Sequence, residues 1–399
     1  MVNSSNANPS ICAHESICAL GLMSGTSLDG VDAAFLVTNG ETIDAFGPSH
    51  FLAYTSAQKD ILKAAMQAAL KWNFKGPPPK IFAQVEEILR ISHTSVIDDL
   101  FLQHPDWAKQ TKLIGFHGQT VLHRPPYGSR LGKTLQLGEG QSLANHVGIP
   151  VIYDFRTCDM KKGGQGAPLA PLYHKALIMA AELRGCVGVL NLGGVGNITL
   201  IEGADVWASD TGPANGPVDN WMQARGIGDY DKGGNCGRQG RVHFHLIEEW
   251  FNRGFFMSKP PRSADRYDFD VLADMSALSL EDGAATLTAY CALSVKRTLK
   301  DMLAASRENE TPIAYPERII ICGGGRHNRT LLNMLRIELS PCRIETADDY
   351  RWDTDSLEAQ AFAYLSVRAL YGRALSLPTT TGVLTSVSGG KKAIPAHSL

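Results

Sequence analysis

Long apolar runs and an excess of charge of one sign are both missing from this 399-residue sequence. No uninterrupted apolar stretch reaches the roughly 18 residues that a membrane-spanning helix needs. Residues 1–16 lack the basic and apolar parts of a secretory signal peptide, so we expect them to form a disordered tail. The net charge of −2 gives no reason to expect a nucleic acid or an anionic membrane as a partner.

Patterns typical of metal sites are also absent. The eight cysteines form neither a CxxC pair nor a compact cluster, which argues against zinc. Several, such as Cys186, Cys291 and Cys322, lie in apolar patterns where a reduced thiol behaves as a small hydrophobic side chain. Residues 229–234 imitate a calcium loop, but Gly240 stands where that loop needs glutamate. The sequence therefore predicts a globular, cytoplasmic protein of about two or three domains.

The most informative segment is a turn between two apolar runs, 17–23 and 31–37. It consists of Gly25, Thr26, Ser27, Leu28, Asp29, Gly30, Val31 and Asp32. A turn of this composition directs N–H groups and hydroxyl oxygens toward one point, which suits a polyanion such as a phosphate chain. Asp29 and Asp32 would repel that chain unless a cation lay between them, so the turn also indicates Mg²⁺. Taken alone, the segment fits an ordinary β-hairpin with a polar turn equally well.

Two further strand-like runs end in glycines. Residues 187–192 are followed by Gly193 and Gly194, and residues 318–322 are followed by Gly323, Gly324 and Gly325. Glycine lets a backbone approach a ligand where a Cβ atom would collide. The helix expected over 328–339 also offers free N–H groups at its start. Three such turns resemble the two-lobed ATPase architecture shared by sugar kinases, actin and Hsp70 chaperones.

The alternation of patterns divides the chain into two lobes. Helices are expected over 56–72 and 80–102, and short strands over 113–116 and 150–153. The strand-turn-strand plan then repeats around 187–207, which marks a second lobe. We assign residues 17–150 and 376–399 to lobe I and residues 151–375 to lobe II. This organisation predicts an α/β fold with an active-site cleft between the lobes.

Three polar residues at expected element ends could carry chemistry. Asp210 follows the strand-like run 206–208, where it could act as a general base on a hydroxyl or a water molecule. Alternatively, Asp210 only caps the helix that runs through Trp221. His117 could be a site residue or a buried, hydrogen-bonded histidine. Glu358 closes the pattern Asp-x-x-Glu, which is also a helix capping box.

Seven segments, in this order, resemble those of the anhydro-N-acetylmuramic acid kinase family, and the resemblance covers about residues 17 to 385. They are Gly25 to Asp32, His117-Gly118-Gln119-Thr120, Asp154-Phe155-Arg156, Gly163-Gly164-Gln165-Gly166-Ala167-Pro168-Leu169, Asn191-Leu192-Gly193-Gly194, Asp210-Thr211-Gly212-Pro213 and Cys322-Gly323-Gly324-Gly325. The resemblance implies an actin-like, ribonuclease H-like fold and a kinase that uses ATP, Mg²⁺ and water. Such a kinase opens the bridge of 1,6-anhydro-N-acetylmuramic acid and phosphorylates O6. The products are N-acetylmuramic acid 6-phosphate and ADP, in peptidoglycan recycling.

The resemblance also implies a role for each matched segment. The turn from Gly25 to Asp32 would hold the ATP phosphates, with Asp29 near Mg²⁺ through water. Gly193 and Gly194 would form a second phosphate turn, and Gly323, Gly324 and Gly325 would lie by the adenosine. Asp210 would activate the water that attacks the anomeric carbon, while the bridge oxygen attacks the γ-phosphorus. His117, Arg156 and Glu358 would orient the sugar. The expected partners are an anhydro sugar and ATP, and a homodimer is the assembly to test.

Two departures from the family's pattern leave the choice of sugar open. The family usually reads Asp-Thr-Gly-Pro-Gly-Asn, whereas this chain has Ala214. The family's Lys-Ser-Thr-Gly-Arg appears here as Arg262-Ser263-Ala264-Asp265-Arg266, which adds an acid. A related kinase that acts on levoglucosan is therefore an alternative. A nucleotide-gated binding protein of the same superfamily is a more remote one, because no segment after about residue 385 is large enough for a peptide-binding module.

Overall fold

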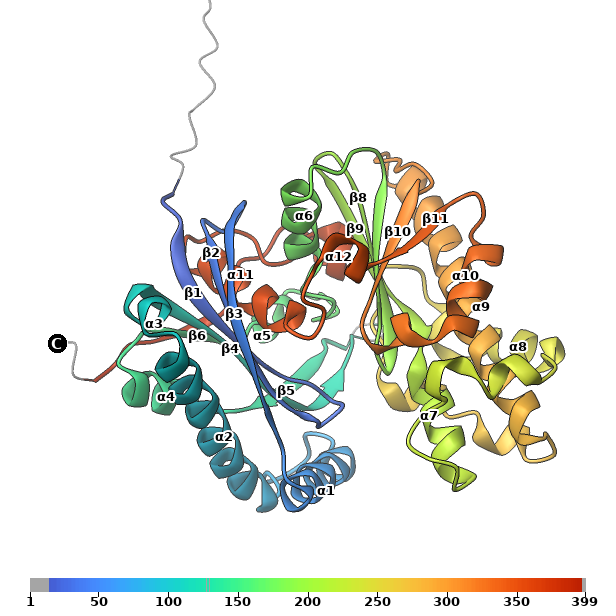
Figure 1. Ribbon diagram of the computed structural model, residues 1–399, viewed down its shortest axis with the longest axis horizontal. Coiled ribbons are helices and arrows are strands. Elements are labelled where there is room, and N and C mark those ends of the chain that lie inside the picture. The colour runs from blue at the N-terminus through green and yellow to red at the C-terminus, as the bar shows by residue number, and fades with distance from the viewer. Residues whose placement is uncertain (1–13, 127, 129, 397–399) are drawn as a thin grey trace, which may run out of the picture.

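The computed structural model describes residues 14–126, 128 and 130–396, which form two α/β lobes side by side (Figure 1). Most of the expected tail, 1–16, lies outside the described residues, and the first strand begins at Ile17. None of the described helices is both long enough and apolar enough to cross a membrane. The predicted two-lobed α/β fold is confirmed.

Within the described residues, lobe I is built on a seven-stranded sheet with the order β12-β6-β4-β1-β2-β3, in which β5 pairs with β4. Its elements are β1 (Ile17–Ser24), β2 (Gly30–Thr38), β3 (Ile43–Ala53), α1 (Ser56–Trp72), α2 (Ile81–Gln103), α3 (Pro105–Gln110), β4 (Thr111–Arg124), β5 (Lys133–Leu137), α4 (Gly140–Val147), β6 (Val151–Tyr153), α5 (Thr157–Lys161), α11 (Leu357–Leu370) and β12 (Lys391–Ala393). Strand β2 runs antiparallel to both of its neighbours, β1 and β3, whereas β4 runs parallel to β1 and β6 runs parallel to β4.

Lobe II is built, in the part of the chain that is described, on a five-stranded sheet with the order β11-β10-β7-β8-β9. Its elements are α6 (Pro171–Ala180), β7 (Val187–Leu192), β8 (Val195–Glu202), β9 (Asp205–Pro213), α7 (Asn215–Ala224), α8 (Phe244–Phe251), α9 (Leu280–Glu308), β10 (Arg318–Cys322), α10 (Arg329–Glu338), β11 (Arg343–Thr346) and α12 (Pro378–Thr381). Short 3₁₀ helices cover 232–234, 237–239, 254–257, 266–269, 272–275, 324–327 and 347–350.

The two sheets share one plan. In each, three antiparallel strands are followed by two parallel ones, so that β1, β2, β3, β4 and β6 correspond to β7, β8, β9, β10 and β11. This is the strand order of ribonuclease H-like domains. The turns between β1 and β2 and between β7 and β8 are therefore equivalent positions in the two lobes.

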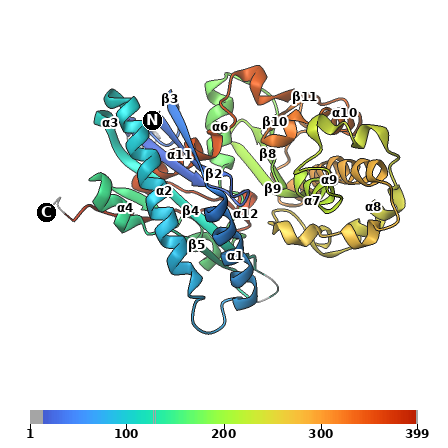
Figure 2. The ribbon, with the colours of Figure 1, turned by 60° about the horizontal axis from the view of Figure 1, so that its bottom comes forward.

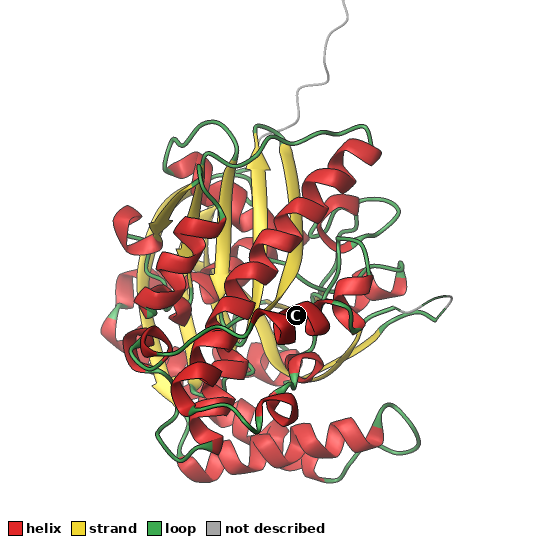
Figure 3. Ribbon diagram, turned by 90° about the vertical axis from the view of Figure 1, so that its right-hand side faces the viewer, coloured by secondary structure: helices red, strands yellow, loops and turns green. Residues whose placement is uncertain are grey.

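Helices cover both faces of the first sheet. Figure 2 shows α2 along its outer side, where this helix contacts β2 and β3. On the inner side α11 packs against β1, β2 and β4. A side view shows strands between layers of helices (Figure 3). The predicted helix 56–72 is confirmed as α1, whose N-cap Thr55 forms a capping box with Gln58.

Two glycines allow α11 to approach the first sheet closely. A Cβ atom on Gly21 of β1 would lie 1.8 Å from the carbonyl oxygen of Ala359. A Cβ atom on Gly115 of β4 would lie 2.1 Å from that of Phe362. Any larger residue would push the helix outward, and with it the N-terminal end of α11 that carries Glu358.

A shared hydrophobic core joins the lobes through α6 and α11. Tyr173 of α6 is fully buried and its hydroxyl donates to Oε1 of Gln360 on α11 at 2.6 Å. Both β6 and α11 belong to lobe I, because β6 pairs with β4 and α11 packs on β1. The predicted lobe II, residues 151–375, included both elements. Hydrophobic periodicity identifies a strand or a helix, but it does not reveal which sheet that element joins.

Candidate active site

A cavity of about 1250 Å³ lies between the lobes. All three glycine turns contribute to its lining, as do His117, Arg156, Asp210 and Glu358. The candidate residues are therefore brought to one place, although 333 positions separate Gly25 from Glu358 in the sequence. This arrangement supports the interlobe site that the sequence predicted.

The first turn presents only part of its predicted set to the cavity. Gly25, Thr26, Ser27 and Asp29 line the cavity. In contrast, Leu28 and Val31 are buried in the core of lobe I. Gly30 is buried at the start of β2, where a Cβ atom would lie 2.3 Å from the carbonyl oxygen of Leu52. Their expected ligand contacts are therefore replaced by roles in packing.

Asp29 is already fixed within this turn. Its Oδ1 accepts hydrogen bonds from the Ser27 hydroxyl at 2.7 Å and from the Gly30 N–H at 3.1 Å. Asp32 lies three residues later, on β2. Its pKa is raised to about 7, first by burial and then by the nearby negative charges of Asp29 and Glu358. These carboxylates repel one another, so a cation at this place would be stabilised by all of them.

The second turn is tied to lobe II by main-chain hydrogen bonds. The carbonyl of Gly193 accepts from the N–H of Asn215 at 2.8 Å. The carbonyl of Gly194 accepts from the N–H groups of Ala214 and Gly216, both at 3.2 Å. A Cβ atom on Gly194 would meet no atom within 4 Å. The space beside this turn is therefore open to a ligand.

In the third glycine cluster only Gly324 lines the cavity, together with His327 and Asn328. Gly323 has a φ of 75°, and a Cβ atom there would lie 2.4 Å from Oδ1 of Asn191. A Cβ atom on Gly325 would lie 2.5 Å from Cβ of Leu192. These two glycines serve close packing against β7 rather than ligand contact. Gly324 and Gly325 belong to a 3₁₀ helix, Gly324–His327, which precedes α10.

Asp210 lies inside β9 and not after the end of a strand, as its sequence context suggested. It does not cap α7, because the N-cap position is Ala214 and no side chain forms a cap there. Its side chain is 6% exposed and its Oδ2 accepts from the N–H of Ala264 at 2.8 Å. No described residue donates to Oδ1. Burial raises the pKa of Asp210 to about 7, opposed by this hydrogen bond and by Arg156.

His117 and Arg156 form a hydrogen-bonded pair. His117 lies within β4, which continues to Arg124 instead of ending at residue 116 as predicted. Its Nδ1 is 2.7 Å from the carbonyl oxygen of Gly118, and its Nε2 accepts from Nε of Arg156 at 3.1 Å. Burial and the Arg156 charge lower the pKa of His117 well below its ordinary value. His117 is therefore a neutral imidazole that is both buried and part of the cavity lining.

Glu358 lies on the first turn of α11 and lines the cavity. The predicted capping box is not formed, because the N-cap is Ser356 and it makes no side-chain cap. Oε1 of Glu358 accepts from Nδ2 of Asn191 at 3.5 Å, which connects it to lobe II. The surrounding protein raises the pKa of Glu358, although its side chain is still open to the solvent of the cavity.

The cavity also has walls that the sequence analysis did not identify. They include Lys59 and Lys63, four positions apart on α1, and residues 229–233 with Asp219 and Asn215 of lobe II. The calcium-like pattern 229–234 uses its Asp231 carboxylate internally, since it accepts from the N–H groups of Cys236 and Gly237. The available signal for α1 was a pair of lysines at helical spacing on the first helix after the phosphate turn.

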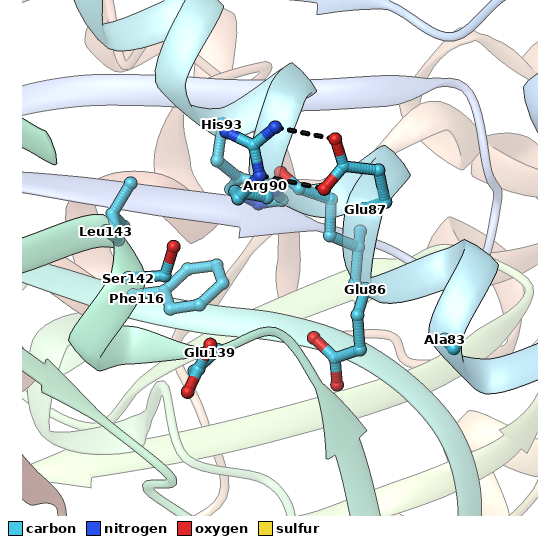
Figure 4. Close-up of a pocket in the computed structure, with 10 residues that line it drawn as sticks. Ala83, Glu86, Glu87, Arg90, His93, Phe116, Glu139, Ser142 and Leu143 are labelled. Carbon is cyan, nitrogen blue, oxygen red and sulfur yellow. Dashed lines mark hydrogen bonds and ion pairs between the residues drawn. The ribbon is translucent and has the colours of Figure 1, made fainter.

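A second, smaller cavity of about 150 Å³ opens on the outer side of lobe I, between α2 and α4 (Figure 4). Its polar lining includes Glu86, Glu139 and the Glu87–Arg90 ion pair. Oε2 of Glu86 accepts from the N–H of Gly138 at 2.9 Å. None of the predicted site residues lines this cavity. Across the described chain, no group of three or more His, Cys, Asp or Glu side chains is arranged to hold a metal ion.

Comparisons with known proteins show which family the sequence matches. The family model described as anhydro-N-acetylmuramic acid kinase matches residues 17–394. A protein of that name from Mesorhizobium japonicum is 42% identical over 95% of this chain and 100% of its own length. One from Brucella anthropi is 42% identical over 94% of this chain and 98% of its own. Component A of (R)-2-hydroxyglutaryl-CoA dehydratase from Acidaminococcus fermentans is a solved structure with 12% identity and a TM-score of 0.41, covering 88% of this chain and 98% of its own.

Proposed function

The chain belongs to the anhydro-N-acetylmuramic acid kinase family, and we propose that it converts 1,6-anhydro-N-acetylmuramic acid, ATP and water into N-acetylmuramic acid 6-phosphate and ADP. One structural observation carries the assignment of the site. Asp210 of lobe II faces the same cavity as the polar turn Gly25 to Asp29 of lobe I. A base and a phosphate-binding turn that face one cavity can act on opposite ends of one substrate.

Asp210 is the proposed general base. Its Oδ2 is held by the N–H of Ala264, and its Oδ1 has no hydrogen-bond donor among the described residues. A carboxylate with a pKa of about 7 accepts a proton more readily than an ordinary aspartate. We propose that Oδ1 takes a proton from water as that water bonds to the anomeric carbon. The C1–O bond of the bridge breaks, and the released O6 bonds to the γ-phosphorus as ADP leaves.

The turn Gly25 to Asp29 and the turn Gly193–Gly194 are proposed to hold the ATP phosphates from both sides. The exposed hydroxyls of Thr26 and Ser27 and the open space beside Gly194 support this arrangement. Lys59 and Lys63 add positive charge on the same wall. Phosphate oxygens that develop charge during transfer are stabilised by such donors.

The donor set also fits Mg²⁺. The Asp29, Asp32 and Glu358 carboxylates interact electrostatically, and Asp29 belongs to the turn that would hold phosphate, while Asp32 follows it on β2. Mg²⁺ keeps several water ligands and takes one or two carboxylates together with phosphate oxygens, so a preformed cage of protein ligands is not required. When bound, the ion would neutralise phosphate charge. Asp29 and Asp32 are the residues proposed to hold it.

His117, Arg156 and Glu358 are proposed to orient the sugar. Nη1 of Arg156 donates to the carbonyl of Gly166 at 2.7 Å, and its Nε donates to His117. These bonds fix the guanidinium plane beside Asp210. Pre-positioned groups of this kind reduce the entropic cost of reaching the reactive geometry.

The test is a direct assay with the purified chain. ATP consumption and product mass are measured with 1,6-anhydro-N-acetylmuramic acid, with levoglucosan and without sugar. Formation of a sugar 6-phosphate only with the first sugar supports the proposal. Equal or faster turnover of levoglucosan, or ATP hydrolysis that no sugar changes, would contradict it.

Two further proposals concern the cellular location of the protein and its oligomeric state. ATP is the phosphoryl donor, and its supply in the cytoplasm supports a cytoplasmic enzyme. The homodimer stays a prediction, and sedimentation equilibrium at several protein concentrations tests it.

A further inference from the structure

The segment Arg262 to Asp265 of lobe II borders β9, the strand that carries Asp210. The main-chain N–H of Asp210 donates to the carbonyl of Arg262 at 3.0 Å, and the N–H of Ala264 donates to the Asp210 carboxylate at 2.8 Å. The segment therefore fixes both the backbone and the side chain of the proposed base. A small displacement of Ala264 would rotate or release the carboxylate.

Arg262 anchors one end of this segment inside lobe II. Its side chain is 3% exposed, and its Nη2 donates to the hydroxyl of Thr298 at 3.0 Å and lies 3.3 Å from the Asp301 carboxylate on α9. Its guanidinium carbon also lies 4.4 Å from the ring centre of Phe255. Movement of the segment must therefore arise at its other end.

That other end contacts lobe I and the chain between the lobes. The Ser263 hydroxyl lies 3.4 Å from Nε2 of His123 at the end of β4. The same residue donates from its N–H to Oε1 of Gln165 at 3.2 Å. Asp265 forms an ion pair with Arg124, also on β4, at 3.5 Å. Burial lowers the pKa of His123 to about 4, so the Ser263 contact involves a neutral imidazole.

Strand β4 also carries His117, which is proposed to orient the sugar. One strand of lobe I thus reaches the sugar through His117 and the base-holding segment through His123 and Arg124. Asp265 is also the acid by which the segment 262–266 departs from the pattern it resembles. The ion pair crosses the cleft, with Arg124 at 32% and Asp265 at 18% side-chain exposure, so it forms only when the lobes are close.

We propose that Ser263 and Asp265 are positioning residues that couple the approach of β4 to the orientation of the Asp210 carboxylate. When the lobes are close, Arg124 and His123 hold the segment, and Ala264 holds Asp210 in place for the attacking water. When they separate, the segment loses its lobe I contacts and the base loses its fixed orientation. Water activation is thereby restricted to the closed state. The proposal rests on the proposed role of Asp210 as base.

The first test is kinetic. Asp265→Asn and Arg124→Gln are each expected to lower kcat by on the order of tenfold, with little change in the KM for ATP, because orientation of the base is affected and nucleotide binding is not. The charge-swapped double variant Arg124→Asp with Asp265→Arg should recover most of that loss. Lys259→Gln is the matched control, since its pair with Glu308 lies close by in lobe II, is exposed and does not cross the cleft.

The second test does not depend on activity. Hydrogen–deuterium exchange is measured without substrate on peptides that contain the N–H groups of Asp210 and Ala264. Asp265→Asn and Ser263→Ala should accelerate exchange there, whereas Lys259→Gln should not. Unchanged kcat together with unchanged exchange would overturn the inference. A swapped variant that stays as slow as the single variants would also overturn it.

The two experiments separate this inference from the proposed function. If the wild-type chain fails to phosphorylate the sugar, the proposed function fails and the exchange experiment alone decides whether the segment is coupled to lobe I. If the wild type is active and Asp210→Asn retains its rate, Asp210 is not the base, and coupling of the segment to it has no catalytic meaning.

Discussion

Among the described residues, each lobe has one carboxyl group whose pKa is raised to about 7, and the causes of the two shifts differ. In lobe II, burial is the main cause that raises the pKa of Asp210, with a smaller contribution from the charge of Asp268, while the Ala264 N–H and the Arg156 charge oppose the shift. In lobe I, burial of Asp32 is reinforced by the negative charges of Asp29 and Glu358. Most of the groups around Asp210 therefore favour its anion, whereas the groups around Asp32 oppose its anion. The first environment suits a base and the second suits a cation.

The equivalent turns of the lobes differ in the same sense. The turn between β7 and β8 is uncharged, and both of its carbonyls accept hydrogen bonds from the start of α7. The turn between β1 and β2 exposes Thr26, Ser27 and Asp29 to the cavity. One strand plan thus supplies a rigid, neutral wall in lobe II and a polar, acidic wall in lobe I. The proposed base lies in lobe II and the polar phosphate turn in lobe I, so the proposed reaction requires both lobes to contact one substrate.

The largest expected effect is at the base. Asp210→Asn keeps the shape of the side chain but cannot accept a proton, so kcat should fall by about a hundredfold to ten-thousandfold with little change in the KM for ATP. Steady-state kinetics at saturating sugar measure it. Retention of the wild-type rate would mean that Asp210 has only a structural role.

A smaller loss is expected in the acidic wall of lobe I. Asp29→Ala should lower the rate at saturating Mg-ATP by on the order of a hundredfold, because a carboxylate linked to the metal is lost. Asp44→Ala is the control, since Asp44 is an exposed carboxylate of the same lobe that does not line the cavity. Equal rates for the two variants would contradict the proposal that the first turn binds the ATP phosphates and Mg²⁺.

A substitution in the uncharged turn of lobe II should affect only the binding of ATP. Gly194→Ala places a methyl group in the open space beside the second turn, so the KM for ATP should rise by about tenfold without loss of stability. In Gly188→Ala the Cβ atom would lie 2.7 Å from Cγ1 of Ile319 in the core. That control should lower the free energy of unfolding by about 1–3 kcal/mol and leave the KM for ATP unchanged. An unaltered KM in Gly194→Ala would place the nucleotide elsewhere.

The smallest expected effects are on thermal stability, measured as Tm. Because the folded-state pKa of Asp210 lies above the ordinary 3.8, its contribution to stability is full below pH 3.8 and is lost as the pH rises through about 7. Asp210→Asn should therefore raise the Tm at pH 8 by about 2–5 °C and raise it by less at pH 5, where only part of that contribution is lost. A stabilisation that is equal at both pH values would show that burial of the charge is not its cause.

The pKa of Asp32 is shifted in the same direction as that of Asp210, but we expect a bound cation to offset its effect on stability. At pH 8, Mg²⁺ should raise the Tm of the wild type, because the ion relieves repulsion among the lobe I carboxylates. The increase should be reduced in Asp32→Asn and retained in Asp210→Asn, and excess EDTA should abolish it. A Mg²⁺ effect that is equal in all three proteins would remove the contrast between the lobes.

Local patterns predicted the elements well but not their contacts. The helix 56–72 and the strands around the first two glycine turns lie where expected, because periodicity and capping determine them. Asp210 and His117 were expected at strand ends but lie inside β9 and β4, because polar residues that face a cavity interrupt the apolar pattern of a strand that continues. Gly323 and Gly325 serve packing against β7, a long-range contact that has no local signal.

In the proposed reaction, a water molecule activated in lobe II attacks the sugar while phosphate is transferred from the turns between the lobes. Single-turnover reactions in ¹⁸O-labelled water test it, with product N-acetylmuramic acid 6-phosphate held in the same water for the same time to correct for exchange at C1. Mass spectrometry should find one ¹⁸O atom on the C1 hydroxyl and none on the transferred phosphate. Label found only in inorganic phosphate, or a C1 hydroxyl without label above the exchange control, would contradict the account.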